Sequence, residues 1–253
     1  MKSPWFKFKN INKEWRYHIP IKNKYYLRMK KLFIAAFLVA THFVSAQVTK
    51  GIGNFTKVTA FDKIDVTLVH ATGEPKIVLT GAGSEDVEIV QKDYELKIRM
   101  PLGKLLKGDN ITATVYYLKD VYEFEANEGS RISSNEVFHG MNLNFIAKEG
   151  SNIKLNVNTQ KINVKSFNGS VINLSGKAQN MDVVINSGGI VEARDCMTSQ
   201  AVVSVNAGGS ADVTASDLVD AKTRAGGNIT IYGNPKQVNQ KTVLGGNIVI
   251  NKR

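Results

Sequence analysis

The chain has 253 residues, of which 43% are hydrophobic and 22% charged, and its formal net charge is +11. Ten of its 33 Lys and Arg residues but only one of its 22 Asp and Glu residues precede Gln47, which leaves 23 basic and 21 acidic side chains, a net charge of +2, in residues 47–253. This near balance argues against nucleic-acid binding, which requires a basic face on the folded domain, and the single cysteine, Cys196, excludes an internal disulfide.

Residues 1–28 are basic and aromatic, and they fit neither a folded domain nor a signal peptide. We interpret them as the product of a start codon assigned too far upstream, with Met29 as the true start. A long charged region in front of the signal peptide is the alternative. Both interpretations leave residues 1–28 outside the folded domain.

Residues 29–46 have the order of charged, apolar and small residues that is typical of a secretory signal peptide. Lys30 and Lys31 precede an apolar run from Leu32 to Val44, and the small residues after it predict cleavage following Ala46. The run of about thirteen residues is short for a membrane helix, and a buried helix is its alternative interpretation. The sequence therefore predicts export, with no transmembrane segment in the mature chain.

Residues 47–125 alternate apolar and polar side chains without a fixed repeat, which predicts short strands between glycine-rich or acidic turns. The expected strands are Lys63–Val69, Lys76–Thr80, Val87–Val90, Glu95–Met100, Ile111–Leu118 and Tyr122–Ala126. Large residues such as Phe55 and Tyr116 suit a wider segment at the end of a stack. We expect an atypical capping portion of one domain that spans residues 47–253.

A six-residue phrase recurs seven times in residues 126–253, with Gly first, Ser or Gly second, and mostly apolar residues at alternate positions after them. Its copies begin at Gly129, Gly150, Gly169, Gly188, Gly208, Gly226 and Gly245. Self-similarity at a period of about twenty residues is typical of stacked repeats, and glycine suits corners that need a left-handed backbone. The predicted corner glycines are Gly129, Gly150, Gly169, Gly189, Gly209, Gly227 and Gly246.

Apolar side chains at alternate positions lie on both sides of each corner, which predicts strands because alternate side chains leave a strand on opposite faces. The pairs after the corners include Ile153/Leu155 and Ile229/Ile231, and the sets before them begin with Tyr122/Phe124/Ala126. We therefore predict an all-β fold, a right-handed parallel β-helix or solenoid-like stack with two short strands in each coil. An antiparallel sandwich or barrel is the main alternative.

The signal peptide, the run Phe61–Val66 and the tandem corners that end in Gly226-Gly227-Asn228-Ile229 and Gly245-Gly246-Asn247-Ile248 resemble the bacterial head GIN domain family over about residues 55–240. The family is described as autotransporter adhesins and is largely of unknown function. The resemblance implies an all-β, exported protein of a Gram-negative envelope, located in the periplasm, at the outer membrane or outside the cell. It implies no catalytic motif.

Chemistry-bearing residues are sparse after the leader. His70 and His139 fall in different repeats and Cys196 in a corner, so the sequence predicts no metal site, no Cys-His nucleophile and no cofactor. Glu192 and Asp212 are 20 residues apart and are predicted to stack in adjacent coils. A polysaccharide-active enzyme built on such a carboxylate pair is an alternative that we regard as weaker than a non-catalytic protein.

Outward Asn and Thr side chains are frequent in the repeats and predict flat polar ladders. Such ladders suit binding of a surface glycan or an envelope protein, and the candidate binding residues are Asn144, Asn163, Glu192 and Asp212. A purely structural or oligomerising envelope protein is the alternative function. The last coil near Ile250 is predicted to leave a sheet edge that a second copy of the chain or the N-terminal segment would cover.

Overall fold

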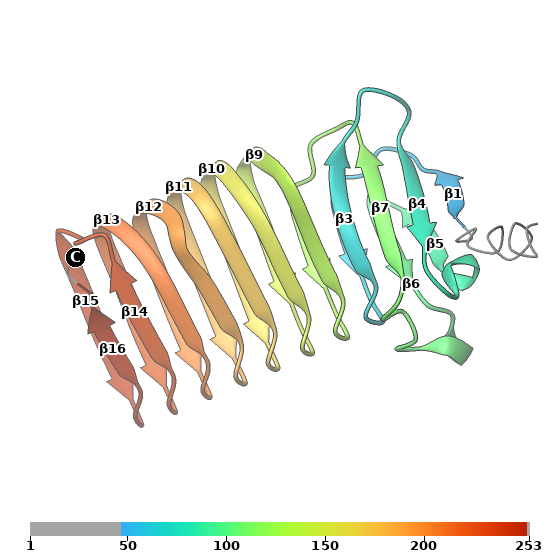
Figure 1. Cartoon of the computed structure of the whole chain (residues 1–253). Helices are drawn as coiled ribbons and strands as arrows, with labels where there is room; N and C mark the ends of the chain where they lie inside the picture. The colour runs from blue at the N-terminus through green and yellow to red at the C-terminus, as the bar shows by residue number, and fades with distance from the viewer. Residues whose placement is uncertain (1–46, 252–253) are drawn as a thin grey trace, which may run out of the picture. The chain divides into compact units, whose positions relative to one another are not determined.

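The computed structural model describes residues 47–251, which fold into a nearly all-β solenoid of about seven turns with 66% strand and 3% helix (Figure 1). The strands are β1 (Val48–Gly51), β2 (Lys57–Ala60), β3 (Asp65–His70), β4 (Lys76–Thr80), β5 (Glu88–Lys92), β6 (Glu95–Arg99), β7 (Thr112–Tyr117), β8 (Glu123–Ala126), β9 (Arg131–Ala147), β10 (Asn152–Phe167), β11 (Val171–Asn186), β12 (Ile190–Asn206), β13 (Ser210–Arg224), β14 (Asn228–Tyr232), β15 (Gln237–Val243) and β16 (Asn247–Ile250). Two 3-10 turns, η1 (Ser84–Asp86) and η2 (Leu102–Lys104), lie near the N-terminal end of the stack. The predicted leader and signal peptide lie outside the described residues.

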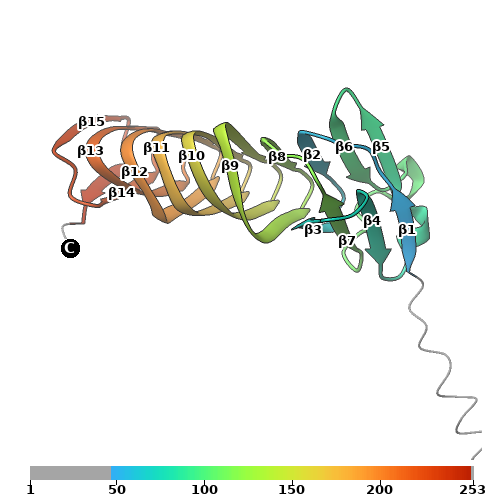
Figure 2. The ribbon, with the colours of Figure 1, turned by 90° about the horizontal axis from the view of Figure 1, so that it is seen from above.

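Each coil contributes to two sheets that face each other across the core. The beginning of β9 pairs with β3 through residues 131–133, whereas its end pairs with β8 through residues 144–147. The first sheet therefore contains β1, β4, β7 and β3, the first halves of β9 to β13, and β14 and β16. The second sheet contains β5, β6, β2 and β8, the second halves of β9 to β13, and β15. Figure 2 shows these flattened coils from above.

The capping portion differs from the regular coils in its strand pairing. β1 pairs with β4, β4 with β7 and β5 with β6 in antiparallel register, whereas β3, β7 and β9 are parallel to one another. Of these antiparallel pairs, β5 and β6 are joined by a short turn, whereas β1 and β4, and β4 and β7, are separated by longer stretches of chain. Five of the six strands expected here overlap with β3, β5, β6, β7 and β8, and the sixth coincides with β4; β1 and β2 were not expected.

The prediction of two short strands in each coil is wrong for β9 to β13, which are single strands of 15 to 17 residues. One corner of each coil is a tight turn, but at the other the chain bends without leaving the parallel ladder. Irregular register marks this bend between Lys154 and Asn156 and between Asn173 and Gly176. Adjacent coils bend at the same level, so their hydrogen bonds continue around the bend. In the last coil, β14 and β15 are separate strands.

The tight corners form a row along one edge of the stack (Figure 1). In the first of them the Ser130 N–H donates to the Asn127 carbonyl at 3.0 Å, and Glu128 and Gly129 both have positive φ angles, 54° and 72°. Two consecutive positive φ angles define a type I′ turn, which explains glycine at its second central position. Gly150 and Gly169 occupy the same position in their own turns.

The other predicted corner residues, Gly189, Gly209, Gly227 and Gly246, lie one residue after the turn, where earlier coils have serine. A Cβ atom at Gly189 would lie 2.5 Å from the Ser166 carbonyl oxygen. Close approach of the neighbouring coil thus explains glycine at position 189, whereas Gly209, Gly227 and Gly246 also have positive φ angles, 97°, 101° and 117°.

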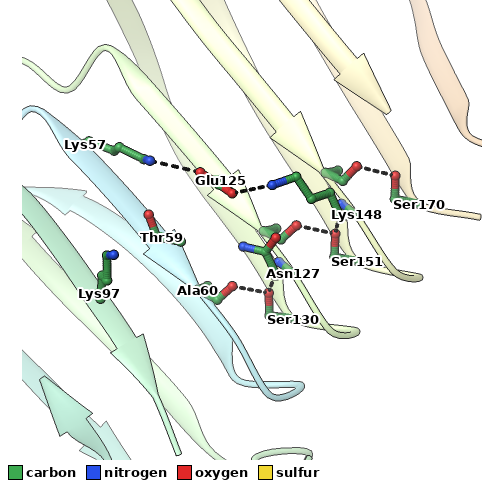
Figure 3. Close-up of polar contacts among 12 residues, drawn as sticks. Lys57, Thr59, Ala60, Lys97, Glu125, Asn127, Ser130, Lys148, Ser151 and Ser170 are labelled. Atoms are coloured by element: carbon green, nitrogen blue, oxygen red, sulfur yellow. Dashed lines mark hydrogen bonds and ion pairs between the residues drawn. The ribbon is translucent and has the colours of Figure 1, made fainter. Parts of the chain in front are cut away.

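Serine at this position forms a buried ladder in the first three corners (Figure 3). The hydroxyls of Ser130, Ser151 and Ser170 donate to backbone carbonyls of the preceding coil at 2.9, 2.7 and 2.8 Å. Each hydroxyl oxygen also accepts the N–H three residues earlier in its own turn. Satisfying both groups inside the core ties each turn to its neighbour.

The inward side chains of the second sheet become smaller from β8 toward the C-terminal coils. Register partners in successive strands are Phe124, Phe145, Val164, Val183, Val203, Ala221 and Gln240. Phe124 and Phe145 stack at 5.2 Å between ring centroids, and Phe138 contacts Phe124 edge to face at 4.8 Å. Predicted inward residues are buried in the middle coils, but Gln240 and Thr242 are exposed in the last one. The stack therefore ends in a polar rung.

Candidate functional site

The four predicted binding residues form two separate pairs. Asn144 and Asn163 are register partners on the outer face of the second sheet, in β9 and β10. Glu192 and Asp212 are register partners on the first sheet, in β12 and β13, where the Glu192 carboxylate accepts a hydrogen bond from Asn173 at 2.8 Å. Because the two sheets face opposite directions, the two pairs belong to different surfaces.

The asparagine pair belongs to a cluster of three amides. Asn163 Nδ2 donates to Asn142 Oδ1 at 2.7 Å and to Asn144 Oδ1 at 2.9 Å. The period of two in β9 places Asn142 and Asn144 on one face, and the parallel register places Asn163 beside them. Both Nδ2 hydrogens of Asn163 are used in these bonds, and the Nδ2 groups of Asn142 and Asn144 donate no hydrogen bond within residues 47–251. The cluster offers fixed donors to solvent.

Two shallow hollows flank this amide cluster. One, of about 340 Å³, is lined by Glu123, Asn144, Ile146, Asn163 and Lys165, together with Phe145. The other, of about 410 Å³, is lined by Tyr122, Gly140, Met141 and Asn142. Asn163 bonds to Asn144, which lines the first hollow, and to Asn142, which lines the second, so the two hollows lie on either side of the amide cluster. We call Tyr122, Met141, Asn142, Asn144, Asn163 and Lys165 the junction surface.

An aromatic and a thioether side chain lie on the junction surface. Tyr122 is 36% exposed and Met141 is 73% exposed. A Cβ atom at Gly140 would lie 3.2 Å from Tyr122 Cδ1, which shows that the ring packs over this glycine. The prediction that Tyr122 faces the core is wrong, because Tyr122 precedes β8 and the inward alternation begins at Phe124.

A chain of ion pairs lies beside the junction surface on the second sheet (Figure 3). Lys57 Nζ lies 3.1 Å from Glu95 Oε1 and 2.9 Å from Glu125 Oε2, and Lys148 Nζ lies 2.8 Å from Glu125 Oε1. Thr59 donates a hydrogen bond to Glu95 at 2.6 Å. The chain links β2, β6 and β8 of the capping portion to the corner after β9.

The ion pairs determine the charge states of this network. Burial opposes ionisation of Glu125, but hydrogen bonds from Lys148 and Lys57 outweigh it and hold the Glu125 pKa below its usual value. Burial likewise opposes ionisation of Glu95, and contacts with Thr59, Lys57 and Lys97 lower its pKa. The Lys57 pKa is raised, since hydrogen bonds to Glu125 and Glu95 outweigh its burial. These carboxylates are therefore ionised and paired near neutral pH.

The remaining chemistry-bearing residues are placed as follows. Cys196 is fully buried in β12, and burial raises the pKa of its thiol to about 12. His70 and His139, which are 69 residues apart in the sequence, line the same cavity because β3 and β9 are neighbours. Within residues 47–251, no group of three or more His, Cys, Asp or Glu side chains could hold a metal ion. No helix in this range is long and apolar enough to span a membrane.

The junction residues that sequence reasoning missed are Tyr122 as an exposed side chain and Met141. Met141 follows Gly140 at the bend of β9, where an apolar residue interrupts a polar stretch. That interruption is the available signal in the sequence. For Tyr122 the alternating pattern was misleading, since this residue lies two positions before the buried Phe124 and so has the spacing of a core residue.

Comparison with known proteins places this architecture in a family. Residues 54–235 match the family model described as "Putative auto-transporter adhesin, head GIN domain". No match is found among curated proteins.

Solved structures share the fold at low sequence identity. A "putative adhesin" from Bacteroides fragilis superposes with a TM-score of 0.70 at 20% identity, covering 81% of this chain and 96% of that one. A "putative adhesin" from Parabacteroides merdae gives 0.63 at 18% identity, with 83% and 97% covered. A "putative lipid binding protein" from Parabacteroides distasonis gives 0.58 at 14% identity, with 83% and 98% covered. At these identities the similarity establishes the fold.

Proposed function

Because the chain belongs to the head GIN domain family of adhesin-like proteins, we propose that it is an exported, non-catalytic module that binds glycans through the junction surface. Export to the envelope of a Gram-negative bacterium agrees with the sequence of residues 29–46. The proposed site on the folded domain is the outer face of the second sheet, where the capping portion meets the regular coils.

One observation carries the proposal: an exposed aromatic ring lies beside amides that are already held in place. Sugar rings present hydroxyl groups, which both donate and accept hydrogen bonds, next to apolar C–H faces. Tyr122 and Met141 offer apolar contact, and the free Nδ2 groups of Asn142 and Asn144 offer donors. The combination of apolar surface with a few fixed polar groups is what small-molecule sites use for specificity.

Pre-organisation supports binding at this location over other parts of the ladders. Asn163 fixes Asn142 and Asn144 through two short hydrogen bonds, so less side-chain freedom is lost when a ligand binds. Lys165 adds a cation that makes no ion pair within the described residues and would favour acidic sugars. On the first sheet, where Glu192 and Asp212 lie, the Tyr232 ring is already covered by Arg194, whose guanidinium carbon is 4.8 Å from the ring centroid.

A glycan array tests the proposal directly. The chain from Gln47 onward is expected to bind a defined set of glycans, and the double variant Asn144→Ala/Asn163→Ala is expected to lose about tenfold or more in affinity. Asn144→Ala removes a hydrogen bond of about 1 kcal/mol to the ligand, and Asn163→Ala removes the bond that holds Asn142 in place. Asn173→Ala, on the opposite sheet, is the matched control and should bind normally. Absence of binding across a broad array, or equal binding by the double variant, would overturn the proposal.

A further inference from the structure

A second cavity, of about 240 Å³, lies at the bend of the coils and is built from residues that are far apart in the sequence. His70 is the last residue of β3, Tyr117 is the last residue of β7, and residues 136–139 lie in the middle of β9, just before Gly140. Asp120 and Val121, between β7 and β8, complete the wall. Both histidines of the described chain therefore meet in one cavity with two carboxylates.

Tyr117 forms the floor of this cavity. The residue is 6% exposed, its ring stacks on Phe138 at 5.9 Å, and the His70 ring contacts it edge to face at 5.4 Å. Its hydroxyl makes no hydrogen bond to residues 47–251. Among residues 47–251, Asn127 Nδ2 is the side-chain nitrogen or oxygen that is both fully buried and without a hydrogen-bond partner. The Tyr117 hydroxyl also has no partner there, so it cannot be fully buried, and it opens into the cavity that Tyr117 lines. The hydroxyl is therefore available to a ligand in the cavity.

The two carboxylates have no cationic partner. Neither Asp120 nor Glu136 forms an ion pair with a Lys or Arg side chain of the described chain, whereas Glu95 and Glu125 on the second sheet do. The Asp120 carboxylate accepts one long hydrogen bond, from the Tyr122 hydroxyl at 3.4 Å. Burial raises the Tyr117 pKa to about 12, with further contributions from Glu136 and Asp120, so the cavity is negatively polarised at the hydroxyl.

We propose that this cavity binds a primary ammonium group, which Asp120, Glu136 and the Tyr117 hydroxyl oxygen surround. An ammonium has three N–H donors and no acceptor, which matches three oxygen groups on the cavity wall. Charge-assisted hydrogen bonds to carboxylates are the strong ones. The site is lined by none of the junction-surface residues, and it meets that surface at the hydrogen bond from the Tyr122 hydroxyl to Asp120. It adds recognition of an ammonium group to the glycan binding proposed there.

The composition of the cavity favours an ammonium over other ligands. A structural metal needs three or four protein ligands, and no such group of His, Cys, Asp and Glu is found in residues 47–251. A phosphate or sulfate would meet two carboxylates and be repelled. The carrier of the ammonium can be a lysine side chain, an amino sugar or an ethanolamine headgroup, all of which present the same charged group.

Titration followed by NMR of the backbone amides distinguishes these carriers. The probes are Nα-acetyl-lysine methylamide, glucosamine and ethanolamine, each paired with its N-acetylated neutral counterpart, and calcium chloride alone. At least one amine is expected to shift the resonances of residues 117–121 and 136–139, while its acetylated form does not. The amine that binds most tightly identifies the carrier.

Variants locate the binding groups. Glu136→Gln is expected to weaken amine binding about tenfold because it removes a charge-assisted hydrogen bond. Tyr117→Phe keeps the ring packing and is expected to weaken amine binding severalfold. Glu149→Gln, an exposed carboxylate at a corner, is the matched control and should leave affinity unchanged. No shift with any amine, equal shifts with the acetylated probes or with calcium, or full binding by Glu136→Gln would overturn the proposal.

Discussion

The region where the capping portion meets the first regular coils differs from the middle of the stack in the size of its core side chains and in the residues on its surface. The middle coils repeat small aliphatic rungs such as Val183 and Val203 under polar ladders. The junction packs Phe124, Phe138 and Phe145 against one another and places Tyr122 on its surface. The regular coils repeat the same packing, whereas the aromatic cluster and the exposed tyrosine occur where the repeat begins.

The largest expected effect is loss of the aromatic packing at the junction. Phe124→Ala should lower the free energy of unfolding by about 4 kcal/mol, because it removes a buried ring that contacts two others. Ile172→Val in the middle of the stack should cost only about 1 kcal/mol. Urea unfolding monitored by circular dichroism measures both. Equal losses would show that the junction is packed no more tightly than the repeats.

Glycines of the regular coils offer the next contrast. Gly176 has a φ angle of 108°, and a Cβ atom there would lie 2.1 Å from the Val157 carbonyl oxygen of the neighbouring coil. Gly176→Ala should therefore cost about 3 kcal/mol. Gly188→Ala, at a turn with φ 76° and open space around the Cβ position, should cost about 1 kcal/mol. Thermal unfolding of the two variants checks the difference, and a reversed order would contradict close coil contact at Gly176.

The buried serine ladder predicts a smaller effect at the corners. Ser151→Ala removes a hydroxyl that donates to the Ala126 carbonyl at 2.7 Å, and it should cost about 1 kcal/mol. The carbonyl retains a hydrogen bond from the Lys148 N–H, which limits the loss. Hydrogen exchange at residues 148–152 provides the measurement, with faster exchange than in the parent chain expected. Unchanged exchange would mean that the backbone alone holds the corner.

The smallest effect concerns the ion pairs that join the capping portion to the coils. The pKa of Glu125 is lowered on folding, so its ionisation stabilises the fold above about pH 4.5, and this stabilisation is lost as the pH falls through the lower folded value. Glu125→Gln should therefore cost up to about 1 kcal/mol at pH 7 and less at pH 3. Urea unfolding at the two pH values tests this, with Glu149→Gln as control. A pH-independent difference would contradict the ionic role.

The solenoid could be predicted from the sequence because glycine and apolar residues recur at the period of the coils. The sequence predicted a parallel stack, the inward rungs and the stacking of Glu192 with Asp212 in adjacent coils. It could not predict that both halves of a coil belong to one strand, since the bend uses ordinary residues and has no glycine of fixed position. Nor could spacing reveal the meeting of His70 with His139, which depends on the pairing of β3 with β9.

The sequence also did not allow us to predict which way side chains point at the ends of strands. Tyr122 has the spacing of a core residue, but it lies just before β8, and the adjacent Val121 is buried in its place. The amide cluster depends on rotamers of Asn142 and Asn163 across two coils, for which a repeat pattern holds no information. Both features belong to the junction, so the candidate site is the part of the molecule that the repeat explains least.

The most direct test of the account is NMR mapping of the glycan that gives the strongest array signal. Binding is expected to shift the backbone amides of residues 122–123, 141–146 and 163–165, with little change in β12 and β13. Shifts centred on Glu192 and Asp212, or on β15 and β16 at the end of the stack, would contradict the claim that recognition resides at the junction.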